Sequence, residues 1–332
     1  MKTLIKTLVE AVGPSGHETA VRDLVKAEVA KLADEMRVDA LGNLIVRKGV
    51  KQPDGMRIML SAHMDEIGLI ATHIDDNGFI RFTSIGGLRP HTLLGGRVRF
   101  LNGVSGVIGG ERLENTSAVH GLEKLFIDAG AASKDECPVK VGDMAIFDRP
   151  MLELGHRLVA KSMDNRVSVA ILIEVLRKLK KTPHELYFVF STQEEVGVRG
   201  ATTAAYGVDP DLGVAVDVTG TGDTPKGLRM AVQLGRGPAV KVKDAGMLSD
   251  PRVVRWMTGT AEESKIPYQL EILEGGSTDA RAIQLTRAGV PVGCVSIPCR
   301  YIHSPSEMVD FKDVQNAVAL LVKLLSKPVK LD

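Results

Sequence analysis

The chain has few of the residues that support disulfide scaffolds or carbohydrate-binding clefts. Its 332 residues include three cysteines and one tryptophan, and aromatic residues make up 4% of the total. The cysteine number is odd and Cys294 and Cys299 lack the Cys-x-x-Cys spacing, which argues against a disulfide framework and a zinc knuckle. A glycosidase needs two carboxylic acids in a cleft that aromatic side chains usually line, so this composition disfavours an endoglucanase.

Excess charge of one sign and long apolar runs are also missing. The chain carries 42 basic and 41 acidic residues, which leaves no electrostatic footprint for nucleic acid or anionic membranes. No apolar stretch approaches the roughly 20 residues that span a bilayer. The first ten residues include Lys2, Lys6 and Glu10 where a signal peptide would have an apolar core. We therefore expect a cytoplasmic protein with no nucleic-acid and no membrane partner.

Apolar periodicity indicates alternating helices and strands at both ends of the chain. Glu18 to Leu32 has apolar residues at helical spacing, and Asp164 to Lys181 is also expected to be helical. Met36 to Val46 and Arg57 to Ala62 are expected to be strands that pair as neighbours. This alternation predicts an α/β fold with a mixed, largely parallel sheet covered by helices on both faces.

The middle of the chain has a different pattern. From about residue 69 the apolar runs shorten and glycine turns separate them, and the longer alternation resumes after about residue 156. With 44% hydrophobic residues, the chain can bury a large core. We expect residues 1–68 and 156–332 to form one catalytic domain, with residues 69–155 as a small inserted β-rich domain.

Four apolar, strand-like runs are followed by side chains that can bind a metal. These side chains are His63, the adjacent pair Glu194 and Glu195, Asp217, and His303. Two neighbouring carboxylates at a strand end are costly unless a cation takes up their charge. In an open α/β sheet the ligand site lies beyond the carboxyl ends of the strands. The sequence therefore predicts a metal site at this edge of the sheet.

The residue types also indicate the chemistry. Neutral imidazole and carboxylate bind zinc or cobalt, and Asp65 is close enough in sequence to orient the His63 ring. Asp164 precedes a helix, where it could cap the helix or bridge two ions. Two histidines, two aspartates and one glutamate suit two ions, and the remaining glutamate is then the expected general base. The reaction class is metal-assisted hydrolysis.

Taken in order, five short segments resemble one family. They are His63-x-Asp65-Glu-Ile-Gly68, Met163-Asp164-Asn-Arg166, Glu194-Glu195-Val-Gly197, Asp217-Val-Thr and His303-Ser. Together they resemble the tetrahedral aminopeptidases, the glutamyl, leucyl and lysyl aminopeptidases among the co-catalytic metallopeptidases. The resemblance implies an enzyme that releases N-terminal residues from short peptides with a free amino terminus.

The resemblance also implies a role for each residue. Asp164 would bridge two divalent ions, zinc or cobalt. Glu195 and His303 would complete one ion site, and His63 and Asp217 the other. Glu194 would be the general base and Asp65 the residue that orients His63. The family further implies a homo-oligomer, a dodecamer built from dimers around a cavity, in which the inserted domain is the dimerisation domain.

Two alternatives use the same residues. A related di-metal deacylase or carboxypeptidase is chemically close, because the same metal pair can cleave any amide. A non-catalytic metal- or peptide-binding assembly would need no general base, yet Glu194 is present. For the substrate side chain we expect neutral or aliphatic residues, because Lys243, Arg252 and Arg281 are scattered in the sequence and form no compact basic cluster.

Overall fold

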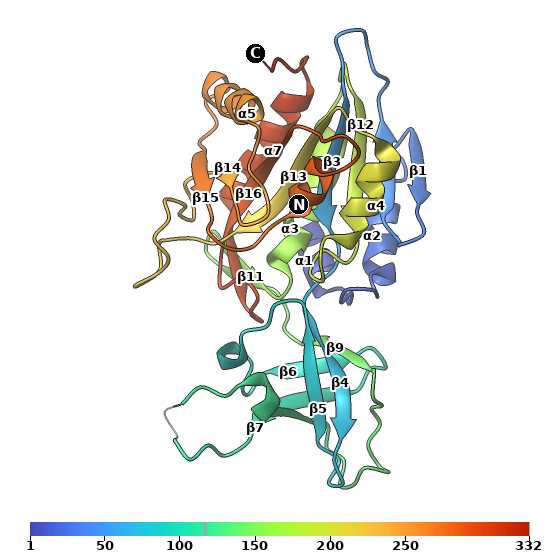
Figure 1. Ribbon diagram of the computed structural model, residues 1–332, viewed down its shortest axis with the longest axis vertical. Helices are drawn as coiled ribbons and strands as arrows, with labels where there is room; N and C mark the ends of the chain where they lie inside the picture. The colour runs from blue at the N-terminus through green and yellow to red at the C-terminus, as the bar shows by residue number, and fades with distance from the viewer. Residues whose placement is uncertain (116–117, 332) are drawn as a thin grey trace.

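The computed structural model describes residues 1–115 and 118–331, which form an α/β part and a separate small barrel (Figure 1). Figure 1 shows the barrel below the α/β part, joined to it by narrow connections. Residues 116 and 117 of the inserted segment lie outside the described residues. An α/β fold with a small β-rich insert is therefore confirmed.

Eleven strands make up the sheet of the α/β part. Nine follow one path, in the order β1 (Glu35–Val38), β2 (Leu44–Lys48), β12 (Glu185–Ser191), β3 (Arg57–His63), β13 (Leu212–Thr219), β16 (Val292–Arg300), β17 (Glu307–Asp310), β11 (Arg157–Ala160) and β10 (Leu152–Leu154). In addition, β14 (Ala239–Lys243) pairs with β16 and with β15 (Gln269–Ile272).

The pairing is parallel in the centre of this sheet and antiparallel at its flanks. The adjacent strands β12, β3, β13 and β16 are parallel, as are β14 and β15. The pairs that flank them, such as β1 with β2 and β16 with β17, are antiparallel. The sheet is thus mixed, as expected, and the parallel character belongs to its buried centre, where helices cover both faces.

Helices cover both faces because the central strands are apolar on both sides. In β3, Ile58 and Leu60 join the larger core and Met59 joins the core on the other face. The larger core includes residues of α1 (Lys2–Glu10), α2 (Thr19–Val29), α3 (Met163–Lys178), α5 (Pro251–Glu263) and α7 (Phe311–Leu325). The opposite core includes residues of α4 (Arg199–Val208) and α6 (Asp279–Gln284).

One predicted strand is in fact a hairpin. Met36 to Val46 was expected to be continuous, but β1 ends at Val38 and β2 begins at Leu44. The Asp39 carboxylate accepts the backbone N–H groups of the turn residues that follow, which favours a turn over an extended chain. The expected pairing of this segment with Arg57–His63 is also wrong, because β12 lies between β2 and β3.

The inserted segment forms a closed barrel with its own core. Its strands follow the order β4 (Gly68–Ile74), β5 (Ile80–Ile85), β8 (Leu125–Asp128), β7 (Ser105–Gly110), β6 (Arg97–Phe100) and β9 (Met144–Phe147). Buried residues such as Leu69, Ile80, Val98 and Ile127 fill it. Closure leaves no free sheet edge, so a small unit of short strands can be stable beside the larger core. After the barrel, β10 pairs with β11 at the edge of the main sheet.

Among the described residues, no helix combines the length and the apolar character that crossing a membrane requires.

Candidate metal centre

The central strands bring the predicted side chains to one edge of the sheet. His63 is the last residue of β3, and Asp217 lies two residues before the end of β13. Glu194 and Glu195 follow β12, and His303 follows β16. Since β12, β3, β13 and β16 are parallel neighbours, their carboxyl ends meet, and these residues line one cavity of about 290 Å³.

Asp164 lies between the two histidines. Its Oδ1 is 3.0 Å from His63 Nε2, and its Oδ2 is 3.5 Å from His303 Nε2. One carboxylate thus faces an imidazole with each of its oxygens. Asp164 belongs to the first turn of α3, and its backbone N–H donates to Glu307 Oε2 at 2.8 Å. Asp164 does not accept a hydrogen bond as a helix cap, so its side chain is available to two cations.

Two groups of potential ligands share this carboxylate. The first consists of His63, Asp164 and Asp217, and the second of Asp164, Glu195 and His303. In each group, the candidate ligand atoms all lie within 4.8 Å of one another. His303 Nε2 is 3.3 Å from Glu195 Oε2, and His63 Nε2 is 3.9 Å from Asp217 Oδ1. This is the pairing of residues that the family resemblance implies.

Asp65 holds both His63 and the glutamate pair. Its carboxylate accepts the backbone N–H groups of Glu194 at 3.0 Å and Glu195 at 3.1 Å. The Ser15 hydroxyl donates to the same carboxylate at 2.7 Å. His63 Nδ1 is 3.1 Å from the Asp65 carbonyl oxygen and 3.4 Å from its Oδ1. Asp65 therefore orients the His63 ring, with Nε2 toward Asp164, and fixes the start of the Glu194–Glu195 loop.

Glu194 lies in the cavity and belongs to neither ligand group. Its Oε2 is 3.9 Å from His63 Nε2, and 12% of its side chain is exposed. Burial and the neighbouring carboxylates of Asp217 and Glu195 raise its pKa well above the ordinary value. A raised pKa means that the carboxylate binds a proton more readily, which suits a group that accepts a proton during the reaction.

The centre as a whole has a surplus of negative charge. Burial raises the pKa of Asp217 well above its usual range and also raises that of Glu195. Burial opposes the protonation of His303, but hydrogen bonds to Asp164 and Glu195 outweigh it and raise its pKa to about 11. In residues 1–115 and 118–331, no Lys or Arg forms an ion pair with the carboxylates of the two groups.

The donor atoms fit divalent cations. Imidazole nitrogens and carboxylate oxygens are the ligands that zinc and cobalt take in proteins. Glu195 Oε1 is buried and has no hydrogen-bond partner within the described part of the chain. A buried carboxylate oxygen without a partner costs free energy, and a cation beside it would remove that cost. His63, Asp164, Glu195, Asp217 and His303 are therefore suitable to hold two ions.

Sequence reasoning missed Glu307, which supports two of the candidate ligands. Its Oε1 accepts the backbone N–H of His303 at 2.9 Å, and its Oε2 accepts that of Asp164 at 2.8 Å. It is 1% exposed at the start of β17. No motif marks it, because it acts through backbone groups from two distant segments. The only signal in the sequence is its position four residues after His303.

The barrel reaches the centre through a loop after β5. A Cβ atom placed at Gly86 would be 2.9 Å from Glu195 Oε2, and one at Gly87 would be 2.7 Å from His303 Nδ1. Larger residues at these positions would displace the candidate ligands. Gly87 lines the cavity, so the inserted segment forms part of its wall, while the residues of both candidate ligand groups come from the α/β part.

Two cationic side chains also line this cavity, Lys241 and Arg281. Arg281, one of the basic residues that are scattered in the sequence, is exposed and also lines the cavity of the candidate ligands. The sequence could not show it, because Arg281 comes from α6 and Lys241 from β14, which the fold alone brings together.

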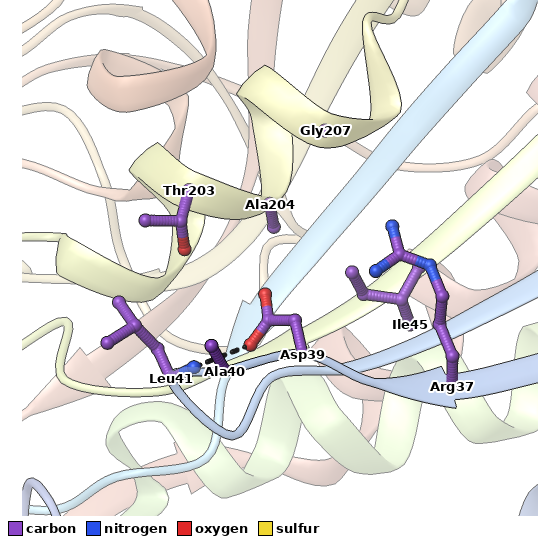
Figure 2. A pocket seen from close by; sticks show the side chains of 8 residues that line it. All are labelled: Arg37, Asp39, Ala40, Leu41, Ile45, Thr203, Ala204 and Gly207. Carbon is purple, nitrogen blue, oxygen red and sulfur yellow. Dashed lines mark hydrogen bonds between the residues drawn. The ribbon is translucent and has the colours of Figure 1, made fainter.

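A second, smaller cavity of about 170 Å³ is unrelated to this chemistry. Figure 2 shows it between the β1–β2 hairpin and α4, lined by Arg37, Asp39, Ala40, Leu41, Ile45, Thr203, Ala204 and Gly207. None of the predicted site residues lines it, and the Asp39 carboxylate is engaged by the N–H groups of its own turn. We assign it no function.

Comparison with known proteins agrees with the geometry. Residues 42–320 match the M42 glutamyl aminopeptidase family. A putative aminopeptidase of Acetivibrio thermocellus is 45% identical over 98% of each chain. An aminopeptidase structure from the archaeon Desulfurococcus kamchatkensis has a TM-score of 0.94 and 40% identity, covering 98% of this chain and 94% of that one.

A third similar protein is described as forming large assemblies. The TET1 peptidase of Pyrococcus horikoshii, which can assemble into a tetrahedron or a large octahedral shell, has a TM-score of 0.88 and 32% identity. The match covers 98% of this chain and 99% of that one. The resemblance to tetrahedral aminopeptidases is thus confirmed, and the chain belongs to the M42 glutamyl aminopeptidase family.

Proposed function

We propose that this aminopeptidase acts through two divalent metal ions, with Glu194 as its general base. His63, Asp164 and Asp217 hold one ion, and Asp164, Glu195 and His303 hold the other. The observation that carries the proposal is the position of Asp164, whose two carboxylate oxygens each face a different histidine. Zinc and cobalt are the ions that best match these ligands.

When bound, two such ions polarise the scissile carbonyl and lower the pKa of a water molecule. Glu194 accepts the proton of the attacking water and returns it to the leaving amine. Asp65 fixes the His63 ring and the backbone of both glutamates, so that Glu194 stays in the cavity while Glu195 stays beside His303. Carboxylates around the cavity also favour the α-ammonium group of a short peptide.

We further propose a homo-oligomer, a dodecamer built from dimers, with residues 69–155 as the dimerisation domain. The barrel presents apolar side chains to solvent, with Leu94, Val107 and Val141 exposed by 54%, 47% and 64%. Contact with another copy would remove this apolar surface from water. Light scattering of the intact protein tests the assembly, and a monomer would contradict it. A cytoplasmic location stays a prediction.

The activity is tested with matched leucyl, lysyl and glutamyl anilides, each assayed on chelator-treated protein with and without added zinc or cobalt. We expect turnover only after metal is restored. An N-acetylated leucyl anilide serves as the control, because an aminopeptidase needs the free amine. Release of acetate from the acetylated compound would favour the deacylase alternative. Release of the aniline from it at a comparable rate would show that the free amine is not required, and metal-independent turnover would contradict the proposal.

A further inference from the structure

Two cationic side chains, Lys241 and Arg281, line the cavity that contains the candidate metal ligands. Lys241 is fully engaged. Its Nζ lies 2.9 Å from Glu271 Oε1 and 3.3 Å from Asp244 Oδ2, and the residue is 1% exposed. Two carboxylates thus surround one ammonium group, so the charge of Lys241 is balanced by partners within the protein.

Arg281 is different. Within the described residues, its guanidinium makes no hydrogen bond or ion pair with any carboxylate or carbonyl, and the residue is exposed. A guanidinium has five N–H donors and keeps its charge at any physiological pH. Arg281 also lines a neighbouring cavity of about 680 Å³ between α4 and α6, so it lies where that cavity meets the metal centre.

A second polar group without a partner lies beside Arg281. Ser277 lines the same cavity, and its Oγ is buried with no hydrogen-bond partner in the described part of the chain. A Cβ atom at Gly246 would be 2.3 Å from Ser277 Oγ and 2.7 Å from Arg281 Cδ. Both side chains therefore pack over one glycine. A buried hydroxyl without a partner is costly, and a ligand oxygen placed there would satisfy it.

We propose that Arg281, together with Ser277, binds a carboxylate of the substrate and determines specificity for peptides that present one. The inference rests on the proposed function, because it places the substrate in the metal-lined cavity. Carboxylates are the groups that a guanidinium binds with two parallel hydrogen bonds. The carboxylate comes either from the side chain of an acidic N-terminal residue or from the C-terminus of a dipeptide. This replaces the expectation of a neutral or aliphatic preference.

The variant Arg281→Gln tests the proposal with two substrate pairs that differ only in charge. One pair is the glutamyl and glutaminyl anilides, and the other is the dipeptide Leu-Gly and its C-terminal amide. In one pair, kcat/KM for the charged member should fall tenfold or more, which is the order of loss expected when one charge-assisted hydrogen bond is removed. The value for the neutral member should stay nearly unchanged. The pair that responds identifies the source of the carboxylate. Arg281→Lys should restore part of the loss.

Arg287→Gln is the matched control. Arg287 lines the neighbouring cavity, where its guanidinium lies 3.6 Å from the centre of the Tyr206 ring, and it does not line the cavity of the candidate ligands. In this variant, kcat/KM for all four substrates should be unchanged. Equal losses for charged and neutral members, or no loss at all in Arg281→Gln, would overturn the proposal. If no compound is turned over, the proposed function fails. Calorimetric binding of the same four compounds then decides the role of Arg281, and a charge preference that Arg281→Gln leaves intact overturns it.

Discussion

Two buried charge clusters include residues of the segment 63–66, with His63 in one and Glu66 in the other, and they balance their charge differently. In the candidate metal centre, carboxylates face histidines and one another, and Glu195 Oε1 has no hydrogen-bond partner among the residues that the structure describes. In the other cluster, Glu66 binds Lys161 at 2.6 Å and Arg166 at 3.3 Å, and each of these residues is at most 2% exposed. The second cluster contains a lysine and an arginine of its own, whereas the carboxylates of the first have only histidines as ion-pair partners in the described part of the chain.

The second cluster also satisfies its backbone neighbours. Arg166 donates to the carbonyl oxygens of Leu8 at 2.8 Å and Gly13 at 3.1 Å, and Lys161 donates to that of Ala11 at 3.0 Å. It thereby ties the end of α1 and the loop after it to α3. A buried charge whose partners are all in the protein is structural, and one whose partners are incomplete marks a binding site.

The largest effect should come from Glu194→Gln, which removes the proton acceptor and leaves both ligand groups intact. Turnover should fall by a factor on the order of 10³ or more while metal content is unchanged. Glu195→Gln is the neighbouring control and should lose metal as well as activity. Kinetics measured beside metal analysis separate the two. Near-normal activity in Glu194→Gln would remove Glu194 from the mechanism.

In the self-balanced cluster, Glu66→Gln should lower the free energy of unfolding by about 3–5 kcal/mol, because two buried cations lose their carboxylate. Chemical denaturation measures the change. Metal content should stay the same in the folded fraction, since Glu66 belongs to neither ligand group. The double variant Glu66→Gln with Lys161→Met should regain part of the stability. A stable Glu66→Gln protein that has lost metal would mean that the two clusters are not distinct.

His303→Ala should weaken one ion and spare the other. Metal affinity at that site should fall by a factor on the order of 10², so content should drop toward one ion per chain and partly recover in excess metal. Titration with zinc, followed by metal analysis, gives the stoichiometry. Unchanged occupancy and activity would exclude His303 as a ligand.

A partly exposed ion pair provides the smallest effect. Arg300 binds Asp223 through two hydrogen bonds at 3.0 and 2.7 Å, and the pair lowers the Asp223 pKa to about 2. A carboxylate with a lowered pKa stabilises the fold above its unfolded value near 4, and this contribution is lost as the pH falls toward 2. Asp223→Asn should therefore remove about 1–2 kcal/mol of stability at pH 7, but little at pH 2. An equal loss at both pH values would show that the ion pair contributes nothing.

The sequence predicted those features that depend on local pattern. Apolar runs followed by His63, Glu194 or Asp217 indicated strands with ligands at their ends, and the short glycine-punctuated runs indicated the β-rich insert. Pairing order is not local, so the position of β12 between β2 and β3 was missed. The hairpin at Asp39 was also missed, because apolar residues on both sides of the turn hid it.

Contacts between residues from distant segments could not be predicted from the sequence for the same reason. Glu307 acts on Asp164, which is 143 residues away, through a backbone N–H. Glu66 stands within the segment that resembles the family, yet its partners Lys161 and Arg166 cannot be identified from spacing. Arg281 looks like any surface arginine until the fold places α6 at the cavity. Such contacts depend on tertiary packing, and no residue pattern encodes them.

The central claim is that Asp164 bridges two ions in a cluster that cannot balance its own charge. The most direct test is the metal content per chain of the wild-type protein and of Asp164→Asn, measured by elemental analysis after loading with zinc and dialysis. The account predicts two ions for the wild type and a loss from both sites in Asp164→Asn, while circular dichroism shows the fold retained. A wild-type protein that holds at most one ion, or an Asp164→Asn protein that holds two, would contradict it.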